Sequence, residues 1–416
     1  MPAIVARRND ETLGLQAVLC YVLSMVVLSK RGAGIAGFPT WQLLKESSIM
    51  MERGLEIINM GGEEPDFPTP QGITQALQKA IAQGFTNYAP PGGIPELREA
   101  LVDAYRKREN LEAEASQAII TNGATQALHL ALLSLVDPGD EVLLPTPYWT
   151  AYPDMVRLAG ANPVQVKCHD DFSLNLDALR KHWTDHTRGV LLSSPISPSG
   201  TLVCAADLKG LAELCAEKGA FLLVDESYQH FVYPPHTFHS AAALFREYGK
   251  HIVLAGSFSK TYAMAGWRIG YAMAPGKLID SMVSIQTATT AGPPTFCQMA
   301  ALEALRFPPR FYQKLAEDFA KRKDIAMALC REIPNFVCND PEATFYLFPS
   351  VKAYLSKGGI RDTNAIASFL LREGLTYIVP STAFGIENHI RISFALPQKK
   401  LKEGFRRIAQ ALSLLT

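Results

Sequence analysis

The sequence predicts an α/β fold, in which a mostly parallel sheet is flanked by helices and accompanied by a smaller α+β domain. From about residue 100 onward, short and nearly continuous apolar runs alternate with amphipathic stretches. Such runs are typical of parallel strands that are covered on both faces. Near residue 305 the alternation stops and a charged helical stretch begins. A chain of 416 residues, 48% of them apolar, can bury enough core for two domains.

Five apolar runs flanked by turn residues or helical stretches are the strand candidates, at residues 118–121, 141–144, 189–192, 221–224 and 252–255. Between the third and fourth of them, residues 205–218 repeat apolar side chains at the spacing of one helical face. Beyond residue 305 we expect a charged helix over 309–332, a strand over 344–348, and then further helices.

These changes of pattern predict the domain boundaries. Residues 67–305 are expected to form the large domain, and residues 36–66 together with 306–416 the small one. Residues 1–35 are left as an N-terminal extension.

The extension contains an uncharged, apolar segment at residues 13–29, preceded by Arg7 and Arg8 and followed by Lys30 and Arg31. This pattern is typical of a signal anchor. The segment is nevertheless shorter than the roughly 20 residues that a membrane-spanning helix usually needs. A packed N-terminal helix, an extension without a function and, less favoured, a membrane anchor all stay open.

Composition narrows the functional classes. The formal net charge is zero, which argues against a broad basic surface for nucleic acid. The seven cysteines are scattered and form no CxxC pair, as expected for reduced, mostly buried thiols of a cytoplasmic protein. No metal site is expected, because His182 and His186, although four residues apart, lack a third ligand nearby in the sequence.

Lys260 is the most informative single residue. It lies between the hydroxyl residues Ser259 and Thr261 and soon after the strand candidate 252–255. An amine held at the end of a buried strand can act as a nucleophile. The alternative at this point is an ordinary solvated loop lysine.

An anion site is the second candidate feature. Residues 121–126 follow a strand and open an apolar helix over 127–135, so their backbone N–H groups and the helix dipole favour an anion. Ser257 and Arg268 would complete the site, because the arginine fork matches phosphate oxygens. The alternatives are a plain turn that needs Gly123 for its backbone angles, and an arginine that caps or forms a salt bridge.

Four further side chains suit a planar, ring-containing ligand and its substrate. Asp225, at a strand end, can hold a proton on a pyridine-type nitrogen, or can cap the next helix. Tyr228 can donate to a phenolate oxygen. Trp149 can stack on a ring, or pack under a loop. Arg391, in an alternating apolar segment, needs an acidic partner, which is either a substrate carboxylate or an internal Asp or Glu.

Taken in this order, these residues resemble the class I and II aminotransferases of fold type I, which use pyridoxal 5'-phosphate. Further matching segments extend the resemblance over about 330 residues: Glu64-Pro65-Asp66-Phe67, Thr86-Asn87-Tyr88-Ala89, Gly93-Ile94-Pro95-Glu96-Leu97-Arg98 and Phe394-Ala395. The resemblance implies a seven-stranded sheet, a homodimer with shared active sites, and a ping-pong transfer of an amino group between amino acids and 2-oxo acids, as in amino acid metabolism.

The resemblance also implies a role for each residue. Lys260 would form the aldimine with the cofactor and move protons, while Asp225 and Tyr228 would bind the ring nitrogen and ring hydroxyl. Tyr88 would reach the phosphate in the partner subunit. The remaining cofactor-binding positions would be Gly123, Ala124, Thr125, Trp149, Ser197, Ser257, Ser259 and Arg268. The substrate-binding positions would be Gly62, Glu63, Trp149 and Arg391, of which Arg391 would bind the α-carboxylate.

Three residues depart from the family pattern. Ser197 stands where an asparagine usually bonds the ring hydroxyl, and its shorter side chain would need a bridging water. Glu63 stands where many relatives have a glycine, so its carboxylate is expected to narrow or recharge the pocket. Thr344 stands where glycine is commoner.

The expected donor is a neutral or aromatic amino acid. One branch of the family binds a side-chain carboxylate with an arginine near residues 278–305, where this chain has no Lys or Arg, and another places a lysine at the position of Thr125. A carbon–sulfur lyase on the same fold is an alternative that Ser197 leaves open. The second alternative is a non-catalytic protein that binds pyridoxal phosphate. The presence of Lys260 and Arg391 argues against it.

Overall fold

The computed structural model describes residues 28–35 and 40–415. Residues 28–35 belong to a separate N-terminal unit, in which α2 (Lys30–Ala33) is a single turn whose Gly32 N–H donates to Ser29 Oγ at 3.0 Å. Nearly all of the apolar segment 13–29 lies outside the described residues. Within the described ranges, no helix combines the length and apolar character needed to cross a membrane.

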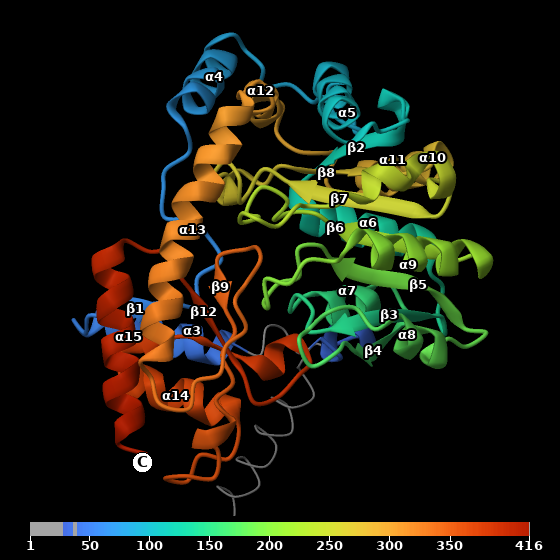
Figure 1. Cartoon of the computed structure of the whole chain (residues 1–416). Helices are drawn as coiled ribbons and strands as arrows, with labels where there is room; N and C mark the ends of the chain where they lie inside the picture. Colours follow the sequence, from blue (N-terminus) through green and yellow to red (C-terminus); the bar gives the residue numbers. More distant parts are fainter. Residues whose placement is uncertain (1–27, 36–39, 416) are drawn as a thin grey trace, which may run out of the picture. The chain divides into compact units, whose positions relative to one another are not determined.

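The main unit is built on a seven-stranded sheet, which confirms the predicted fold class (Figure 1). Across the sheet the strands are ordered β2 (Ala118–Thr121), β8 (Gly270–Met273), β7 (Ile252–Ser257), β6 (Phe221–Asp225), β5 (Thr187–Ser193), β3 (Glu141–Thr146) and β4 (Asn162–Lys167). The pairs among β7, β6, β5, β3 and β4 are parallel, whereas β8 is antiparallel to both β2 and β7.

Two of these strands, β4 and β8, were not predicted from the sequence. The edge strand β4 carries Asn162 and Pro163 and is largely exposed or half-buried, so it lacks the apolar run of a central strand. Proline is tolerated there because an edge strand leaves some N–H groups unpaired. Strand β8 spans four residues and begins at Gly270, which gives a weak strand signal.

Helices flank this sheet, and their bounds follow the sequence pattern. The predicted helix 205–218 is α9 (Ala205–Glu217), and the apolar helix after the anion site is α6 (Gly123–Leu135). The other helical segments of this region are α4 (Gln71–Ala82), α5 (Pro95–Glu109), η1 (Ala115–Gln117), α7 (Tyr152–Leu158), α8 (Leu176–His182), η2 (Ala241–Leu244), α10 (Phe245–Tyr248), η3 (Ala265–Trp267), α11 (Gly276–Thr289) and α12 (Thr295–Ala304).

The sheet separates two buried clusters because neighbouring strand residues point to opposite faces. On β6, Leu222 and Val224 join the cluster that contains side chains of α5, α9 and α12, whereas Leu223 joins the cluster formed with α6, α7 and α11. Burying both faces accounts for the nearly continuous apolar strands in the sequence.

The remaining residues pack into a further core around Phe345, Tyr346 and Phe394. It contains two small sheets, β1 (Ile58–Asn59) with β10 (Thr376–Tyr377), and β11 (Val379–Pro380) with β12 (Ile390–Ser393) and β9 (Tyr346–Leu347). Its helical segments are α3 (Trp41–Glu52), α13 (Pro309–Arg331), η4 (Lys352–Tyr354), α14 (Thr363–Glu373), η5 (Ser381–Phe384) and α15 (Gln398–Ser413). Tyr228, Phe231 and Tyr233 of the predicted large domain also join this core, and the predicted domain boundaries stay a prediction.

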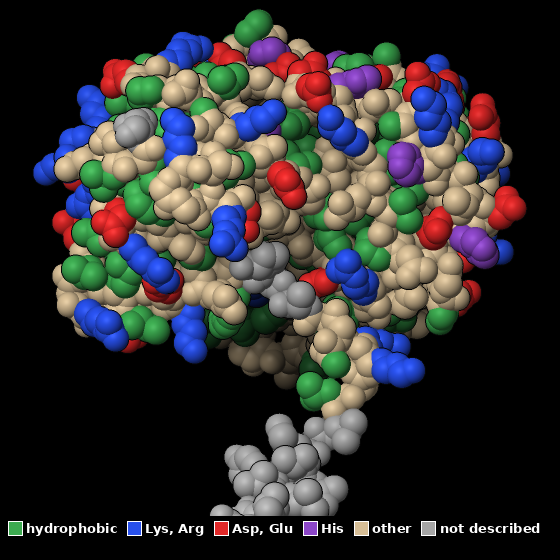
Figure 2. Space-filling view, turned by 90° about the horizontal axis from the view of Figure 1, so that it is seen from below, with side chains coloured by type: hydrophobic (Ala, Val, Ile, Leu, Met, Phe, Trp, Pro, Cys, Tyr) green, Lys and Arg blue, Asp and Glu red, His purple; other side chains and the backbone are tan. Residues whose placement is uncertain are grey.

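Charged side chains of both signs are interspersed on the face shown in Figure 2. This distribution is in keeping with the formal net charge of zero. Among residues 28–35 and 40–415, no group of three or more His, Cys, Asp or Glu side chains is placed to hold a metal ion.

Candidate active site

A pocket of about 700 Å³, including its open mouth, lies where the parallel strands of the large sheet end. Strands β5, β6 and β7 finish at Ser193, Asp225 and Ser257, and the carboxyl edge of such a sheet is the usual place for a ligand. The pocket brings together most of the predicted site residues: Glu63, Ala124, Thr125, Trp149, Ser197, Asp225, Tyr228, Ser257, Ser259, Lys260 and Arg268.

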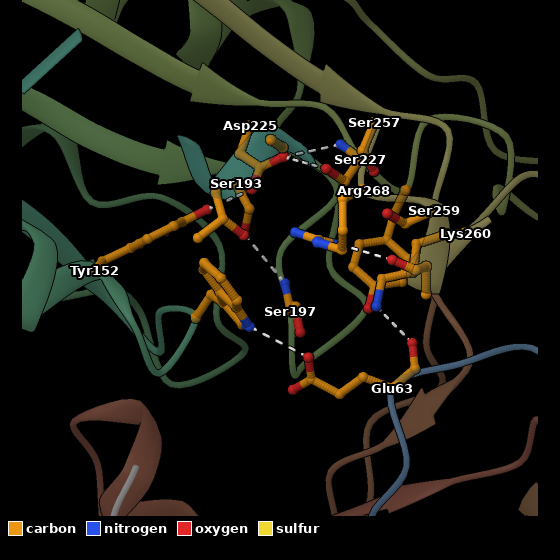
Figure 3. A pocket seen from close by; sticks show the side chains of 15 residues that line it. Glu63, Tyr152, Ser193, Ser197, Asp225, Ser227, Ser257, Ser259, Lys260 and Arg268 are labelled. Atoms are coloured by element: carbon orange, nitrogen blue, oxygen red, sulfur yellow. Dashed lines mark hydrogen bonds between the residues drawn. The ribbon is translucent and has the colours of Figure 1, made fainter. Parts of the chain in front are cut away.

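Lys260 faces this pocket from the turn after β7 (Figure 3). Its Nζ donates a hydrogen bond to the backbone carbonyl of Glu63 and lies 5.6 Å from the centroid of the Tyr228 ring. Burial lowers the pKa of the Lys260 amine, although Glu63 and Asp225 act in the opposite direction. A lower pKa raises the share of the neutral, nucleophilic amine.

The anion site forms at the N-terminus of α6, opposite Arg268. Gly123 has a φ of +76°, and a Cβ on it would lie 2.4 Å from Arg268 Nη2. A Cβ on Gly270 would lie 2.3 Å from the backbone nitrogen of Ala124. Only glycine therefore allows the strand, the helix start and the guanidinium to converge. The backbone N–H groups that begin the helix and the arginine suit a phosphate group.

Arg268 itself is held in position by backbone carbonyls. Its Nη1 donates to the Ala265 carbonyl at 2.8 Å, and its Nη2 to the Asn122 carbonyl at 3.3 Å. No acidic side chain of the described residues forms an ion pair with Arg268, so the salt-bridge alternative finds no support there.

Asp225 is buried and hydrogen-bonded on both oxygens. Its Oδ1 accepts from the Ser227 backbone N–H at 3.0 Å and from Ser227 Oγ at 2.6 Å, and its Oδ2 accepts from Tyr152 Oη at 3.1 Å. Burial raises the pKa of Asp225 even though these bonds and Lys260 oppose the rise. A protonated ring nitrogen beside the carboxylate would supply the positive charge that this environment lacks.

Ser197 offers a buried, unused hydroxyl. Its backbone N–H donates to Ser193 Oγ at 3.2 Å, whereas its own Oγ has no hydrogen-bond partner. Tyr228 also lines the pocket, and its hydroxyl lies 2.8 Å from that of Tyr346. A ring hydroxyl bound near Ser197 would satisfy the unpaired oxygen, which fits the predicted cofactor.

Arg391 is paired with an acidic residue of its own chain, Glu63, which was one of the two predicted alternatives. Its Nη1 donates to Glu63 Oε1 at 2.8 Å, and its Nη2 to the Gly61 carbonyl at 3.0 Å. Burial opposes ionisation of Glu63, but Arg391 and Lys260 outweigh it and lower the pKa of that carboxyl. Glu63 is thus an anion that contacts the expected carboxylate-binding arginine.

Besides Gly123 and Arg391, two further predicted residues lie outside the pocket lining. Gly62 is half-buried between Gly61 and Glu63, which both contact Arg391. Tyr88 is 93% exposed in the single chain. That exposure leaves its ring available to another subunit but places it at no site within this one.

Sequence reasoning missed Tyr152, Ser193 and Ser227, which also line the pocket. The Asp225–Ser227 spacing carried a usable signal, because an aspartate often accepts a bond from the backbone two residues on. Tyr152 opens helix α7 three residues after Trp149, but nothing in its neighbours indicates a bond to a strand 73 residues away.

Comparisons with known proteins decide the family. Residues 56–408 match the sequence profile described as aminotransferase class I and II. The chain belongs to this family. It is 36% identical to the probable aspartate/prephenate aminotransferase of Aquifex aeolicus over 389 aligned residues, and this alignment covers 92% of this chain and 98% of the relative. It is 33% identical over 383 residues to the aspartate aminotransferase of Geobacillus stearothermophilus, again over 92% and 98%.

Solved structures agree with this assignment. The aspartate aminotransferase of Rhizobium meliloti superposes with a TM-score of 0.90 at 34% identity, over 94% of this chain and all of that one. The Thermus thermophilus enzyme with maleate gives a TM-score of 0.87 at 32% identity, over 93% and 100%. The protein is a pyridoxal phosphate-dependent aminotransferase, a transferase of nitrogenous groups, and the pocket residues fit that cofactor.

Proposed function

We propose that this aminotransferase takes the amino group of a neutral or aromatic L-amino acid and passes it to a 2-oxo acid at a single site. The homologous aminotransferases act on amino acids and 2-oxo acids as a class. Relatives named for aspartate share about a third of their residues with this chain, which leaves room for a different donor.

The proposed choice of donor rests on which cationic side chains lie around the pocket. In the described part of the chain, the lining cations are Lys260 and Arg268. Lys260 is assigned to the reaction and Arg268 to the phosphate, and Arg391 is assigned to the α-carboxylate. A side-chain carboxylate would then be buried without a cationic partner, which is costly. Residues 278–305 contain no Lys or Arg that could supply one.

The proposed roles of the residues follow from their positions. When bound, pyridoxal phosphate supplies a conjugated ring that accepts the electron pair left by the α-proton. The Lys260 amine would take the proton from the substrate α-carbon as a base, and as an acid would return one to the cofactor carbon on the other side of the substrate nitrogen. Asp225 holds a proton on the ring nitrogen. Arg391 binds the α-carboxylate and so orients the α-proton toward Lys260.

We further infer a homodimer. The support is Tyr88, which the resemblance assigns to the partner subunit's phosphate and which is 93% exposed in the single chain. A cytoplasmic location stays a prediction from the scattered cysteines.

A donor panel tests the proposal. Purified holoenzyme is assayed with aspartate, alanine, leucine, phenylalanine and tryptophan, each against a common 2-oxo acid, and kcat/KM is compared. We expect a neutral or aromatic donor to have the highest value. A far higher kcat/KM for aspartate than for any other donor would refute the donor assignment. Release of pyruvate and ammonia from a cysteine-like substrate, without amino transfer, would favour the lyase alternative.

A further inference from the structure

Glu63 contacts three of the residues assigned to substrate and cofactor. Its Oε1 accepts from Arg391 Nη1 at 2.8 Å, and its Oε2 from Trp149 Nε1 at 3.4 Å. Its backbone carbonyl accepts from the Lys260 amine (Figure 3). The side chain thus holds a carboxylate at the guanidinium that would bind a donor's α-carboxylate, and its backbone meets the amine that would act at the α-carbon.

Arg391 has little freedom to turn toward a second anion. Its side chain is 2% exposed, and Nη2 is bonded to the Gly61 carbonyl at 3.0 Å. The guanidinium carbon lies 4.4 Å from the centroid of the Tyr346 ring and 5.1 Å from that of Phe384. The Glu63 side chain, by contrast, is 33% exposed and lines the pocket. A carboxylate that enters the site would therefore displace Glu63 rather than move Arg391.

Displacement leaves the Glu63 charge close to the bound donor. While Glu63 is paired with Arg391, the positive charges of Arg391 and Lys260 overcome the opposing effect of burial and keep the pKa of its carboxyl below the ordinary value, so the group that the donor displaces is an anion. The Glu63 backbone carbonyl stays bonded to the Lys260 amine, so the displaced carboxylate remains close to the bound donor. Of the two cations among the described lining residues, Lys260 is assigned to the reaction and Arg268 to the phosphate. A second carboxylate on the donor would face Glu63 without a compensating charge.

We propose that Glu63 is a specificity-determining residue: it occupies the carboxylate subsite at Arg391 until the donor's α-carboxylate displaces it, and its charge then disfavours donors with a second carboxylate. This inference rests on the proposed function, because it takes Arg391 to be the α-carboxylate subsite. It adds a residue whose own side chain competes with the substrate.

Equilibrium binding to the holoenzyme tests the proposal without relying on turnover. Two probes are titrated calorimetrically: 3-phenylpropanoate, which has one carboxylate, and maleate, which has two. The variants are Glu63→Gln, which keeps the size of the side chain, and Glu63→Gly, which removes it if the Gln variant does not fold. Glu64→Gln is the matched control, because it removes the same charge one residue away from an exposed side chain.

In Glu63→Gln we expect 3-phenylpropanoate to bind about tenfold more tightly, because the probe then displaces a neutral hydrogen bond to Arg391 rather than a stronger charge-assisted one. Maleate should gain by a larger factor, because its second carboxylate no longer faces a negative charge. Glu64→Gln should change either dissociation constant by less than about twofold.

Two results would overturn the proposal. The first is that Glu63→Gln leaves both dissociation constants within about twofold of wild type. The second is that maleate gains no more than 3-phenylpropanoate. Failure of the proposed function is a separate result, because it would show as a preference of the wild-type enzyme for aspartate in kcat/KM.

Discussion

Replacing Thr344 by glycine should stabilise the protein, and the structure allows the size of the effect to be worked out. Thr344 is fully buried and has a φ of +66°, in the left-handed region that a β-branched residue rarely adopts. Its position is fixed by a bond from its N–H to the Phe231 carbonyl at 2.8 Å, and by the Tyr233 hydroxyl, which donates to its carbonyl. Its own Oγ1 is buried without a partner.

Two gains oppose two losses in this substitution. Removing the left-handed strain is worth about 1–2 kcal/mol, and removing an unpaired buried hydroxyl about 1–3 kcal/mol. Against this, glycine costs about 0.5–1 kcal/mol in the entropy of the unfolded chain, and the loss of the buried Cβ and methyl carbon roughly 1.5 kcal/mol. The net expectation for Thr344→Gly is a rise of about 1 kcal/mol in the free energy of unfolding.

Chemical denaturation at fixed protein and cofactor concentration measures this difference, since bound cofactor also shifts stability. Thr344→Ala is the matched control, because it removes the hydroxyl and the methyl group but keeps a Cβ and therefore the strain. We expect the glycine variant to exceed the alanine variant, since alanine at a positive φ is less stable than glycine. A glycine variant less stable than wild type would refute the argument, and equal effects of Gly and Ala would remove backbone strain from it.

Three other predictions concern ionisable and polar groups. Lys260→Ala should lower kcat by about 100-fold or more and change the absorption spectrum of the bound cofactor. Ser197→Asn should tighten pyridoxal phosphate binding to the apoprotein by roughly fivefold, the value of one added hydrogen bond, as measured by absorbance titration. Glu226 is fully buried, and burial raises its pKa to about 8 although Ser240 and the Ala241 N–H donate to it. The folded protein keeps a proton on Glu226 that the unfolded chain loses above about pH 4.5, so the free energy of unfolding should fall as pH rises toward 8. Glu226→Gln removes this dependence. Its free energy of unfolding, relative to wild type, should therefore be roughly 2–4 kcal/mol higher at pH 8.5 than at pH 5.

Each of these expectations has a result that contradicts it. A native cofactor spectrum in Lys260→Ala would remove the lysine from the cofactor site. Unchanged or weaker binding in Ser197→Asn would mean that the serine hydroxyl does not face the ring oxygen. An equal effect of Glu226→Gln on unfolding at both pH values would show that the buried carboxyl is ionised in the folded protein.

The sequence was sufficient for the parts of the fold that depend on local pattern. The five predicted strands, including the buried edge strand β2, are apolar because both faces of the sheet are covered, and their turns carry glycines or polar residues at the positions that need them. The edge strand β4 and the short β8 were missed for the opposite reason, since an exposed edge and a four-residue strand leave little pattern.

Pocket residues were predictable where their chemistry follows from a position next to a strand end. Lys260, Asp225 and the anion site around Gly123 all lie at or just beyond the carboxyl ends of strands, and parallel strands bring these ends to the same edge. Tyr152 was not predictable, because its bond to Asp225 depends on how helix α7 packs rather than on any local signal.

Glu63 marks the limit of sequence reasoning most clearly. The chain contains 40 acidic and 40 basic residues, so composition does not indicate which acid meets Arg391, 328 residues away. The sequence did show that Glu63 was unusual for its position, and that Arg391 required an acidic partner in its apolar surroundings. The structure joins these two observations into one contact. Of the two effects expected of Glu63, narrowing or recharging the pocket, the contact with Arg391 favours the second: it places a negative charge on the arginine proposed to bind the substrate, so the proposed consequence is competition for that arginine rather than crowding.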